Sequence, residues 1–216
     1  MKYLLVLLFA CLVLPAGATS VSPMGQALEA TATTGTLRIH NESKETKRYQ
    51  VMVDALTVGP AGERIQAASS DLAFYPSTVI TLKPGATQTL RWKRNTPTSI
   101  QEKAYLVIIR EEPTSSVEDA TGVAVKLRYT PRFLNPWVFV PHGAKPSLSV
   151  KREGSDLVFF NSGTATAPLT QVSFAGKPIP GNFLVLPGER FRLTADGTGR
   201  EVHFVSRGVA QSLPVD

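Results

Sequence analysis

Few residues of this chain have types and spacings that could do catalytic chemistry. Its three histidines are His40, His142 and His203, and none stands in a metal-ligand spacing such as His-x-His or His-Glu-x-x-His. Glu111 and Glu112 are adjacent, so in a strand their side chains leave opposite faces and cannot act as a pair. No nucleophile elbow, phosphate-binding loop or dinucleotide fingerprint occurs. The sequence favours a non-enzymatic protein without cofactor or metal; a site assembled from distant loops stays open, because spacing does not test it.

The segment with the most binding chemistry is 123–129, Val-Ala-Val-Lys-Leu-Arg-Tyr. In a strand, alternation puts its large apolar side chains on one face and two cations on the other. The apolar face holds Val123, Val125, Leu127 and Tyr129, and the opposite face holds Ala124, Lys126 and Arg128. At a sheet edge this strand predicts β-augmentation, in which an extended peptide adds to the edge and a cation binds its terminal carboxylate. On periodicity alone, an ordinary amphipathic strand with solvated cations is the favoured interpretation.

The elements that must position this segment are predicted to be β-strands throughout. Residues 36–40 and 49–53 alternate between apolar and polar, and 105–109 form a continuous apolar run typical of a buried strand. Gly/Pro turns such as Pro84-Gly85 and Pro187-Gly188 separate these runs. Many short strands with such turns predict an all-β sandwich or barrel.

A weak internal repeat predicts the number of domains. In each half, a strand ends in Asn and a later Leu-(x)-Pro-Gly turn opens another strand. The pattern runs from Asn41 to the turn at 82–85, and again from Asn161 to the turn at 186–188. It predicts two related sandwiches, the first with extra strands because its interval is longer. One large sandwich is the alternative.

Four prolines between the two halves are typical of a linker or domain junction. They are Pro131, Pro136, Pro141 and Pro146. We therefore expect an N-terminal domain over 19–133 and a smaller C-terminal domain over 134–216, after a leader over 1–18.

That leader has the pattern of an export signal. A basic start precedes the apolar residues 4–14, and small residues before Ala18 suit cleavage after it. A lipoprotein signal ending at Cys11 is the alternative. The apolar stretch is too short to span a bilayer, so the mature protein is expected in the periplasm or outside the cell, with no membrane span.

Composition excludes further classes. The chain has 216 residues, of which 19% are charged, below the roughly 25% of an average soluble protein, so a disordered or coiled-coil chain is not expected. Its single cysteine, Cys11, excludes an internal disulfide and a Cys-rich zinc site. The net charge of +6 is modest and indicates no nucleic-acid partner by itself.

In its organisation the chain resembles the PapD-like periplasmic chaperones of the usher pathway, which have two immunoglobulin-like domains. The resemblance rests on the order and spacing of several segments, none of them specific alone, and covers essentially the whole mature chain. These are Leu37-x-Ile39-x-Asn41, Leu82-Lys83-Pro84-Gly85-x-x-Gln88-x-x-Arg91, 105–109 with Arg110-Glu111-x-Pro113, Val125-Lys126-Leu127-x-Tyr129-x-Pro131, 157–161 and Leu186-Pro187-Gly188.

The resemblance implies a chaperone that caps pilus or fimbrial subunits by donor-strand complementation, before their assembly at an outer-membrane usher. The last strand of its first domain would be lent to the subunit, and cations in the interdomain cleft would bind the subunit's terminal carboxylate. The implied subunit-binding residues are Val117, Val123, Val125, Lys126 and Arg128.

Three departures mark a divergent member. The cleft Arg expected after a first-strand Pro falls at Gly25, with Arg128 or Arg38 as candidates to compensate. Asp119 and Thr121 interrupt the alternating apolar run before Lys126. The interdomain ion pair keeps a carboxylate, Glu102, but Thr130 replaces its usual Arg.

The alternative function is a secreted or periplasmic β-sandwich binding module, adhesin-like or carbohydrate-binding. Such a module needs aromatic side chains on its loops, and the candidates are Trp92, Trp137 and Phe183. Core or junction positions are the favoured interpretation of all three.

Overall fold

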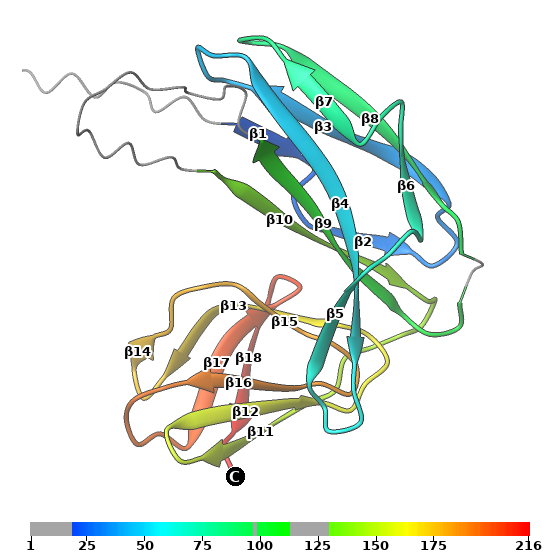
Figure 1. Cartoon of the computed structure of the whole chain (residues 1–216). Helices are drawn as coiled ribbons and strands as arrows, with labels where there is room; N and C mark the ends of the chain where they lie inside the picture. Colours follow the sequence, from blue (N-terminus) through cyan, green and yellow to red (C-terminus); the bar gives the residue numbers. More distant parts are fainter. Residues whose placement is uncertain (1–18, 97–98, 113–129) are drawn as a thin grey trace, which may run out of the picture.

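The computed structural model describes residues 19–96, 99–112 and 130–216, and all the regular structure in these ranges is β. Figure 1 shows two β-sandwiches in tandem, which confirms the all-β, two-domain fold predicted above. Within the described residues, no helix has the length and apolarity needed to cross a membrane.

The first domain packs two sheets face to face. One has the order β1-β3-β8-β6, and its strands are β1 (Thr19–Ser22), β3 (Thr34–Asn41), β8 (Thr87–Arg94) and β6 (Leu72–Tyr75). The other has the order β2-β10-β9-β4-β5, with β7 also pairing β4. Its strands are β2 (Gln26–Glu29), β10 (Arg132–Val140), β9 (Lys103–Glu112), β4 (Lys47–Val58), β5 (Arg64–Ala68) and β7 (Val79–Leu82).

The core of this domain follows from strand alternation. In β3, Leu37 and Ile39 are fully buried while Arg38 between them is exposed. Aromatic rings fill the centre: Trp92 packs edge-on against Trp137 and Phe139, with ring centroids 5.4 and 5.8 Å away. Trp92 and Trp137 are thus core residues, as favoured from the sequence.

The second domain has a three-stranded sheet and a five-stranded sheet. The first has the order β11-β12-β16, with β11 (Leu148–Glu153), β12 (Asp156–Asn161) and β16 (Arg190–Thr194). The second has the order β14-β13-β17-β18, with β15 also pairing β13. Its strands are β14 (Lys177–Pro178), β13 (Ala167–Phe174), β17 (Glu201–Ser206), β18 (Val209–Pro214) and β15 (Phe183–Val185). Phe183 is half-buried and packs against Phe191, with ring centroids 5.4 Å apart.

Strand pairing corrects the expected position of the domain boundary. β10 pairs with β9 from Arg132 to Phe139 and with β2 from Trp137 to Val140. The first domain therefore extends to Val140, beyond the boundary expected at 133. Pro136, expected in a linker, lies inside β10, where a strand at a sheet edge tolerates its missing N–H.

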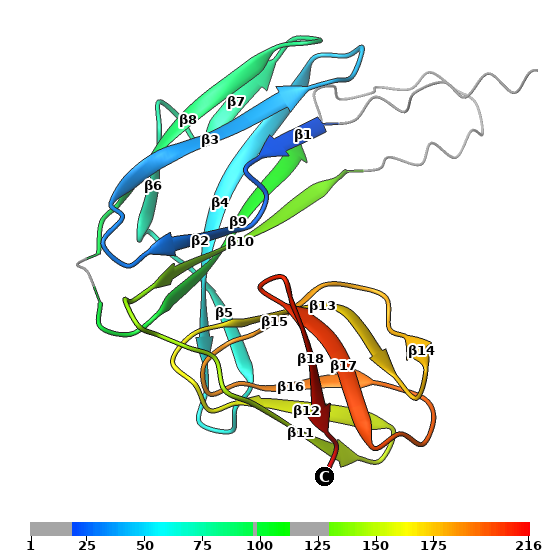
Figure 2. The ribbon, with the colours of Figure 1, turned by 180° about the vertical axis from the view of Figure 1, so that it is seen from behind.

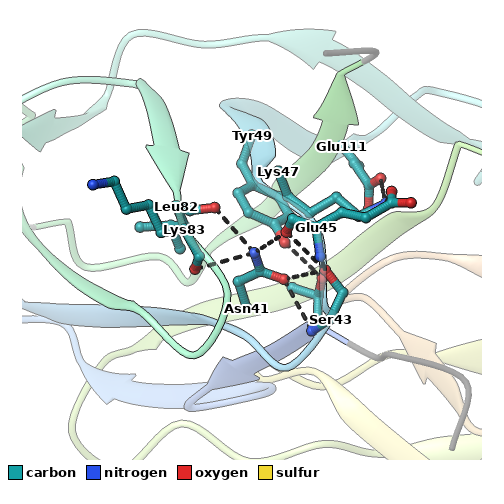
Figure 3. A network of polar contacts seen from close by, with 9 residues as sticks. Asn41, Ser43, Glu45, Lys47, Tyr49, Leu82, Lys83 and Glu111 are labelled. Atoms are coloured by element: carbon teal, nitrogen blue, oxygen red, sulfur yellow. Dashed lines mark hydrogen bonds and ion pairs between the residues drawn. The ribbon is translucent and has the colours of Figure 1, made fainter. Parts of the chain in front are cut away.

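The two adjacent glutamates, Glu111 and Glu112, lie at the end of β9. Glu111 Oε1 lies 2.7 Å from Lys47 Nζ (Figure 3), and Glu112 Oε2 lies 2.9 Å from Arg48 Nε. Because Lys47 and Arg48 are neighbours in β4, the two carboxylates are on opposite faces of the sheet, as expected. Within the described residues, no group of three or more His, Cys, Asp or Glu could hold a metal ion.

The repeated Asn joins two loops at the same place in each domain, the end of β3 in the first and of β12 in the second. Asn41 is fully buried at the end of β3, and Figure 3 shows its amide between two loops. Its Nδ2 donates to the carbonyls of Glu45, Leu82 and Lys83 at 2.7, 3.0 and 3.2 Å. Its Oδ1 accepts the N–H and the hydroxyl of Ser43. One side chain thus joins the β3–β4 loop to the Pro-Gly turn before β8.

Asn161 makes the same contacts at the end of β12. Its Nδ2 donates to the carbonyls of Ala165 and Val185 at 2.8 and 2.9 Å, and its Oδ1 accepts the N–H of Gly163 at 3.0 Å. The backbones also match, since Gly85 donates to the carbonyl of Asn41 and Gly188 to that of Asn161, at 2.8 and 2.7 Å. The sequence repeat is therefore a structural repeat.

Replacing Asn41 should destabilise the first domain. Asn41→Ala removes the side-chain donor to the carbonyls of Glu45, Leu82 and Lys83 and the acceptor of the Ser43 N–H, and we expect a loss of about 3 kcal/mol. Urea unfolding followed by Trp fluorescence measures it, because both Trp residues of the chain lie in the first-domain core. Asn95→Ala is the control: this exposed amide donates to Ser70, so the change should be within about 0.5 kcal/mol. Equal losses in the two variants would contradict this role.

Candidate functional site

The subunit-binding residues expected from the sequence lie outside the described residues. All five fall within 113–129: Val117, Val123, Val125, Lys126 and Arg128. The other candidate cation, Arg38, is exposed on β3, between Ser22 and Thr89 on the neighbouring strands. It does not line the cavity between the domains described below.

Directly after 113–129, part of one backbone edge of β10 has no partner strand among the described residues; this is the free edge of β10. β9 pairs with one side of β10, whereas β2 covers only Trp137–Val140 on the other side. In the part of the chain that the structure describes, no strand pairs with this second side of Arg132–Pro136. Unpaired N–H and C=O groups at such an edge can receive an added strand.

The side chains that β10 turns away from the core are mostly apolar. Arg132 and Leu134 are exposed, Leu134 by 55%, and three half-buried residues continue the alternation toward the second domain: Pro136, Val138 and Val140. On β9, the half-buried Leu106 and the buried Ile108 are the partners of Pro136 and Leu134 in the pairing register, so Leu106 extends this apolar surface onto a second strand. A large exposed Leu within an apolar surface is typical of an interaction site.

Asn135 holds the chain crossover that leaves this edge open. The N-terminal chain passes from one sheet to the other between β1 and β2. There, the buried Asn135 donates to Pro23 O at 2.8 Å and accepts the N–H of Gly25 at 2.5 Å. Gly25 has φ +68°, a conformation that an L side chain rarely adopts. An Arg in this backbone conformation would be strained.

The open edge leads to a cavity of about 520 Å³ between the domains. From the first domain, residues 25–29 and the outer side chains of β10 line it; from the second domain, Thr166, Pro168, Leu184 and Arg207 line it. Among these described lining residues, Arg207 is the only Lys or Arg. The cavity therefore has largely apolar walls, with the cation of Arg207 on the second-domain side and the carboxylate of Glu29 on the first-domain side.

Glu102 bridges the two domains beside this cavity. Its Oε2 accepts the N–H of Thr166 at 2.9 Å, its Oε1 accepts the Thr166 hydroxyl, and Arg207 donates to Thr166 O at 3.2 Å. Burial raises the pKa of Glu102 above its usual 4.5, although the bonds from Thr166 and the charge of Arg207 oppose this. Thr166 and Arg207 thus surround the Glu102 carboxylate. The Arg that the resemblance implies as its partner is replaced by Thr130 in this sequence.

A second bridge joins the β4–β5 hairpin to the second domain. Arg64 Nε and Nη2 lie 2.9 and 2.8 Å from the two carboxylate oxygens of Glu189, a bidentate pair. The Glu189 side chain is only 4% exposed and also accepts the Leu186 N–H at 2.7 Å. Arg64 Nη2 donates further to the carbonyl of Leu184, which lines the cavity. This bridge therefore holds one wall of the cavity in place.

Sequence reasoning found Glu102 but missed Arg64, Glu189, Asn135 and Arg207. Glu189 directly follows the repeated Pro-Gly turn, which could have drawn attention to it. The other three side chains have no local pattern, because their partners lie 41 to 125 residues away in the chain.

The raised pKa of Glu102 predicts a pH-dependent stability. The folded state holds this proton more tightly than the unfolded chain, so Glu102 makes the protein less stable as the pH rises through the raised value. The free energy of unfolding is measured by urea titration over a pH series for the wild type and for Glu102→Gln. The difference, wild type minus variant, should be largest below pH 4.5 and should fall as the pH rises.

Thr166→Val provides the matched comparison for this titration. It removes the hydroxyl bond that lowers the pKa of Glu102, so the fall should extend to higher pH. A difference between wild type and Glu102→Gln that stays flat, or rises with pH, would contradict the raised pKa.

The Arg64–Glu189 pair should contribute substantially to the stability of the joint. Arg64→Gln leaves a carboxylate buried without its cation, and we expect a loss of about 3 kcal/mol in urea unfolding together with a wider spread of interdomain distances in solution scattering. The control is Arg192→Gln, whose pair with Glu153 is exposed on both sides, 57% and 42%. That variant should change stability by less than about 0.5 kcal/mol, and equally small effects in both variants would refute the role of Arg64.

Comparisons with known proteins bear on the fold of the chain. No family model matches the sequence, and no curated protein matches it. A solved structure of the CsuC–CsuE chaperone–tip adhesion subunit complex, from archaic chaperone-usher Csu pili of Acinetobacter baumannii, matches with TM-score 0.70 and 17% identity, over 92% of this chain and 98% of that one. The Salmonella enterica SafA pilin–SafB chaperone complex matches with TM-score 0.69 and 17% identity, over 92% and 96%.

A third solved structure, the CupB2 chaperone of Pseudomonas aeruginosa, matches with TM-score 0.61 and 15% identity, over 91% of this chain and 100% of that one. At such identities the likeness concerns the fold, and it extends over both domains. The chain has the two-domain β-sandwich fold of usher-pathway pilus chaperones.

Proposed function

We propose that the protein is a periplasmic chaperone that binds pilus subunits and caps them by lending an edge of its first-domain sheet. The observation that carries this proposal is the free edge of β10, with its apolar outer side chains leading into the interdomain cavity. An incomplete subunit would pair its backbone with Arg132–Pro136 and cover the exposed Leu134. The reaction is binding alone, with no catalytic step and no cofactor.

Backbone pairing and apolar burial would act together in such a complex. Main-chain hydrogen bonds supply affinity that is independent of sequence, while alternate side chains entering the subunit's open core supply the fit. Covering one Leu contributes about 2 kcal/mol. The donor residues Val117, Val123 and Val125 belong to the same proposal, because in sequence they precede the free edge of β10 directly.

The proposed anchor for the subunit's terminal carboxylate combines Lys126 and Arg128 with Arg207. Arg207 is the cation on the cavity wall, near the position where the expected Arg is replaced by Gly25. Its guanidinium already holds Thr166 O, and it has further donors for a carboxylate. Arg207 would thus compensate for Gly25 from the second domain rather than the first.

The solved complexes support this function. The CsuC–CsuE structure is described as a chaperone–tip adhesion subunit pre-assembly complex, and the SafB chaperone was solved with the SafA pilin. For this chain we propose pilus subunits and an outer-membrane usher as partners, and a periplasmic location after cleavage at Ala18. The carbohydrate-binding alternative loses its main candidates, because Trp92 and Trp137 are buried in the core.

Placing a charge on the free edge should abolish subunit capture. Leu134→Asp removes an apolar contact and buries a carboxylate against the subunit, which should weaken binding by about 3 kcal/mol, or about a hundredfold. The measurement is co-purification, from the periplasm, of a pilin subunit co-expressed with each variant. Lys126→Ala and Arg207→Gln should also reduce pilin recovery if both residues bind the carboxylate.

Ile65→Asp is the matched control, since Ile65 is 43% exposed on β5, at the opposite edge of the same sheet. It should recover as much pilin as the wild type. Loss of pilin with Ile65→Asp, or full recovery with Leu134→Asp, would refute binding at β10.

A further inference from the structure

The outer face of the sheet β1-β3-β8-β6 carries cations without carboxylates. The four strands contain no Asp or Glu. In contrast, the other sheet of this domain contains Glu29, Asp54, Glu111 and Glu112. Both sheets of the first domain contain Lys and Arg, but all the acidic residues of its strands lie in the second of these sheets.

Strand register places the cations of this sheet in adjoining rows. Lys93 lies between Ala73 of β6 and Thr34 of β3, and Arg91 lies between Tyr75 and Thr36. In the next row Thr89 pairs with Arg38, which pairs with Ser22 of β1. Arg38, Arg91 and Lys93 are all exposed. We call these three cations, with the Ser, Thr and Tyr side chains around them, the basic face.

The cations of the basic face have no ion-pair partners among the described residues. Two carboxylates lie near its rim. Glu42 follows the end of β3, and Asp71, before β6, accepts the Tyr105 hydroxyl at 2.8 Å. Neither forms an ion pair with Arg38, Arg91 or Lys93, so the positive charge of the face is available to an external anion.

Hydroxyl groups surround these charges. Exposed hydroxyls from β1, β3 and β8 and the half-exposed Tyr75 ring complete the face. The hydroxyl residues are Ser20, Ser22, Thr34, Thr36, Thr87 and Thr89. Hydroxyl donors beside cations suit phosphate oxygens, and Tyr has an apolar ring with a polar tip that suits the headgroup region of a bilayer.

The shape of the face favours a flat partner over a chain or a small molecule. Neither of the two cavities described for this protein includes a residue of the face; both lie at the domain junction. Figure 2 shows β1, β3 and β8 side by side as one layer of the first domain. We propose that the basic face docks the protein on an anionic phospholipid surface, through the phosphate groups of the lipid headgroups.

This docking leaves the proposed subunit edge free. The basic face and the outer face of β10 belong to opposite sheets, and the core packs between them. The protein can therefore bind a subunit at β10 and a membrane at β3 and β8 at the same time. Each cation near an anionic leaflet contributes a factor of about five in affinity, so the three together contribute about a hundredfold.

Sedimentation with lipid vesicles tests the proposal. Wild type is compared with the triple variant Arg38→Gln, Arg91→Gln, Lys93→Gln on phosphatidylcholine vesicles with and without about 30% phosphatidylglycerol, at about 0.1 M salt. The control is Lys151→Gln, Lys177→Gln, Arg200→Gln, which removes the same charge from exposed residues of the second domain. Far-UV circular dichroism, which reports on the strands of both domains, verifies that all three proteins are folded; Trp fluorescence would report on the first domain alone.

We expect wild type and control to bind the anionic vesicles within a few-fold of each other, and the basic-face variant to bind about a hundredfold more weakly. Equal loss in the control would show that net charge alone matters and would overturn the proposal. Absence of wild-type binding, or binding to soluble heparin but not to vesicles, would overturn it as well. Pilin recovery by the basic-face variant should stay at the wild-type level, so this test and that of the proposed function fail separately.

Discussion

A buried side-chain amide at the end of one strand determines how each domain closes. In both domains the chain must leave a core strand, turn, and later return beside it through a Pro-Gly turn. Backbone N–H and C=O groups in these turns cannot pair within a sheet. Burying them without a hydrogen-bond partner would destabilise the fold, because each unpaired group loses its bonds to water. Asn41 and Asn161 supply donor and acceptor from one side chain, at the same points in both domains. The amide acts together with the backbone bonds from Gly85 and Gly188 to the same two Asn residues, and these contacts together fix each turn relative to its strand.

The joint between the domains depends on these turns. Glu189 follows the second Pro-Gly turn, and its carbonyl accepts the N–H of Asn161 at 3.2 Å. Its side chain then receives Arg64 from the first domain. Packing of Leu56 and Ala104 against Leu186 adds an apolar contact beside this pair. The amide of Asn161 thus acts indirectly on the interdomain cavity, because it positions the turn whose neighbour binds the first domain.

Local patterns predicted most of the fold and part of the site. Alternation and turns identified the strands, and the Asn and Pro-Gly repeat identified two domains, because both are encoded by neighbouring residues. The domain boundary was placed too early, since Pro136 has the composition of a linker but lies in a strand that tolerates it. The bridge from Arg64 to Glu189 was not predictable, because it joins residues 125 apart in the chain. The binding strand around Lys126 stays a prediction, since it lies outside the described residues.

The unequal length of the two domains has a consequence for how modules of this kind assemble. The longer interval between Asn41 and its turn contains β5, and β5 carries the Arg64 that reaches the second domain. The second domain, with the shorter interval, offers the receiving carboxylate but has no equivalent arm. The interdomain contact is therefore asymmetric: the first domain supplies the Arg side chain, and the second domain supplies the carboxylate. The contact that joins the two domains thus has different elements on its two sides, a hairpin strand on the first domain and the residue after a Pro-Gly turn on the second.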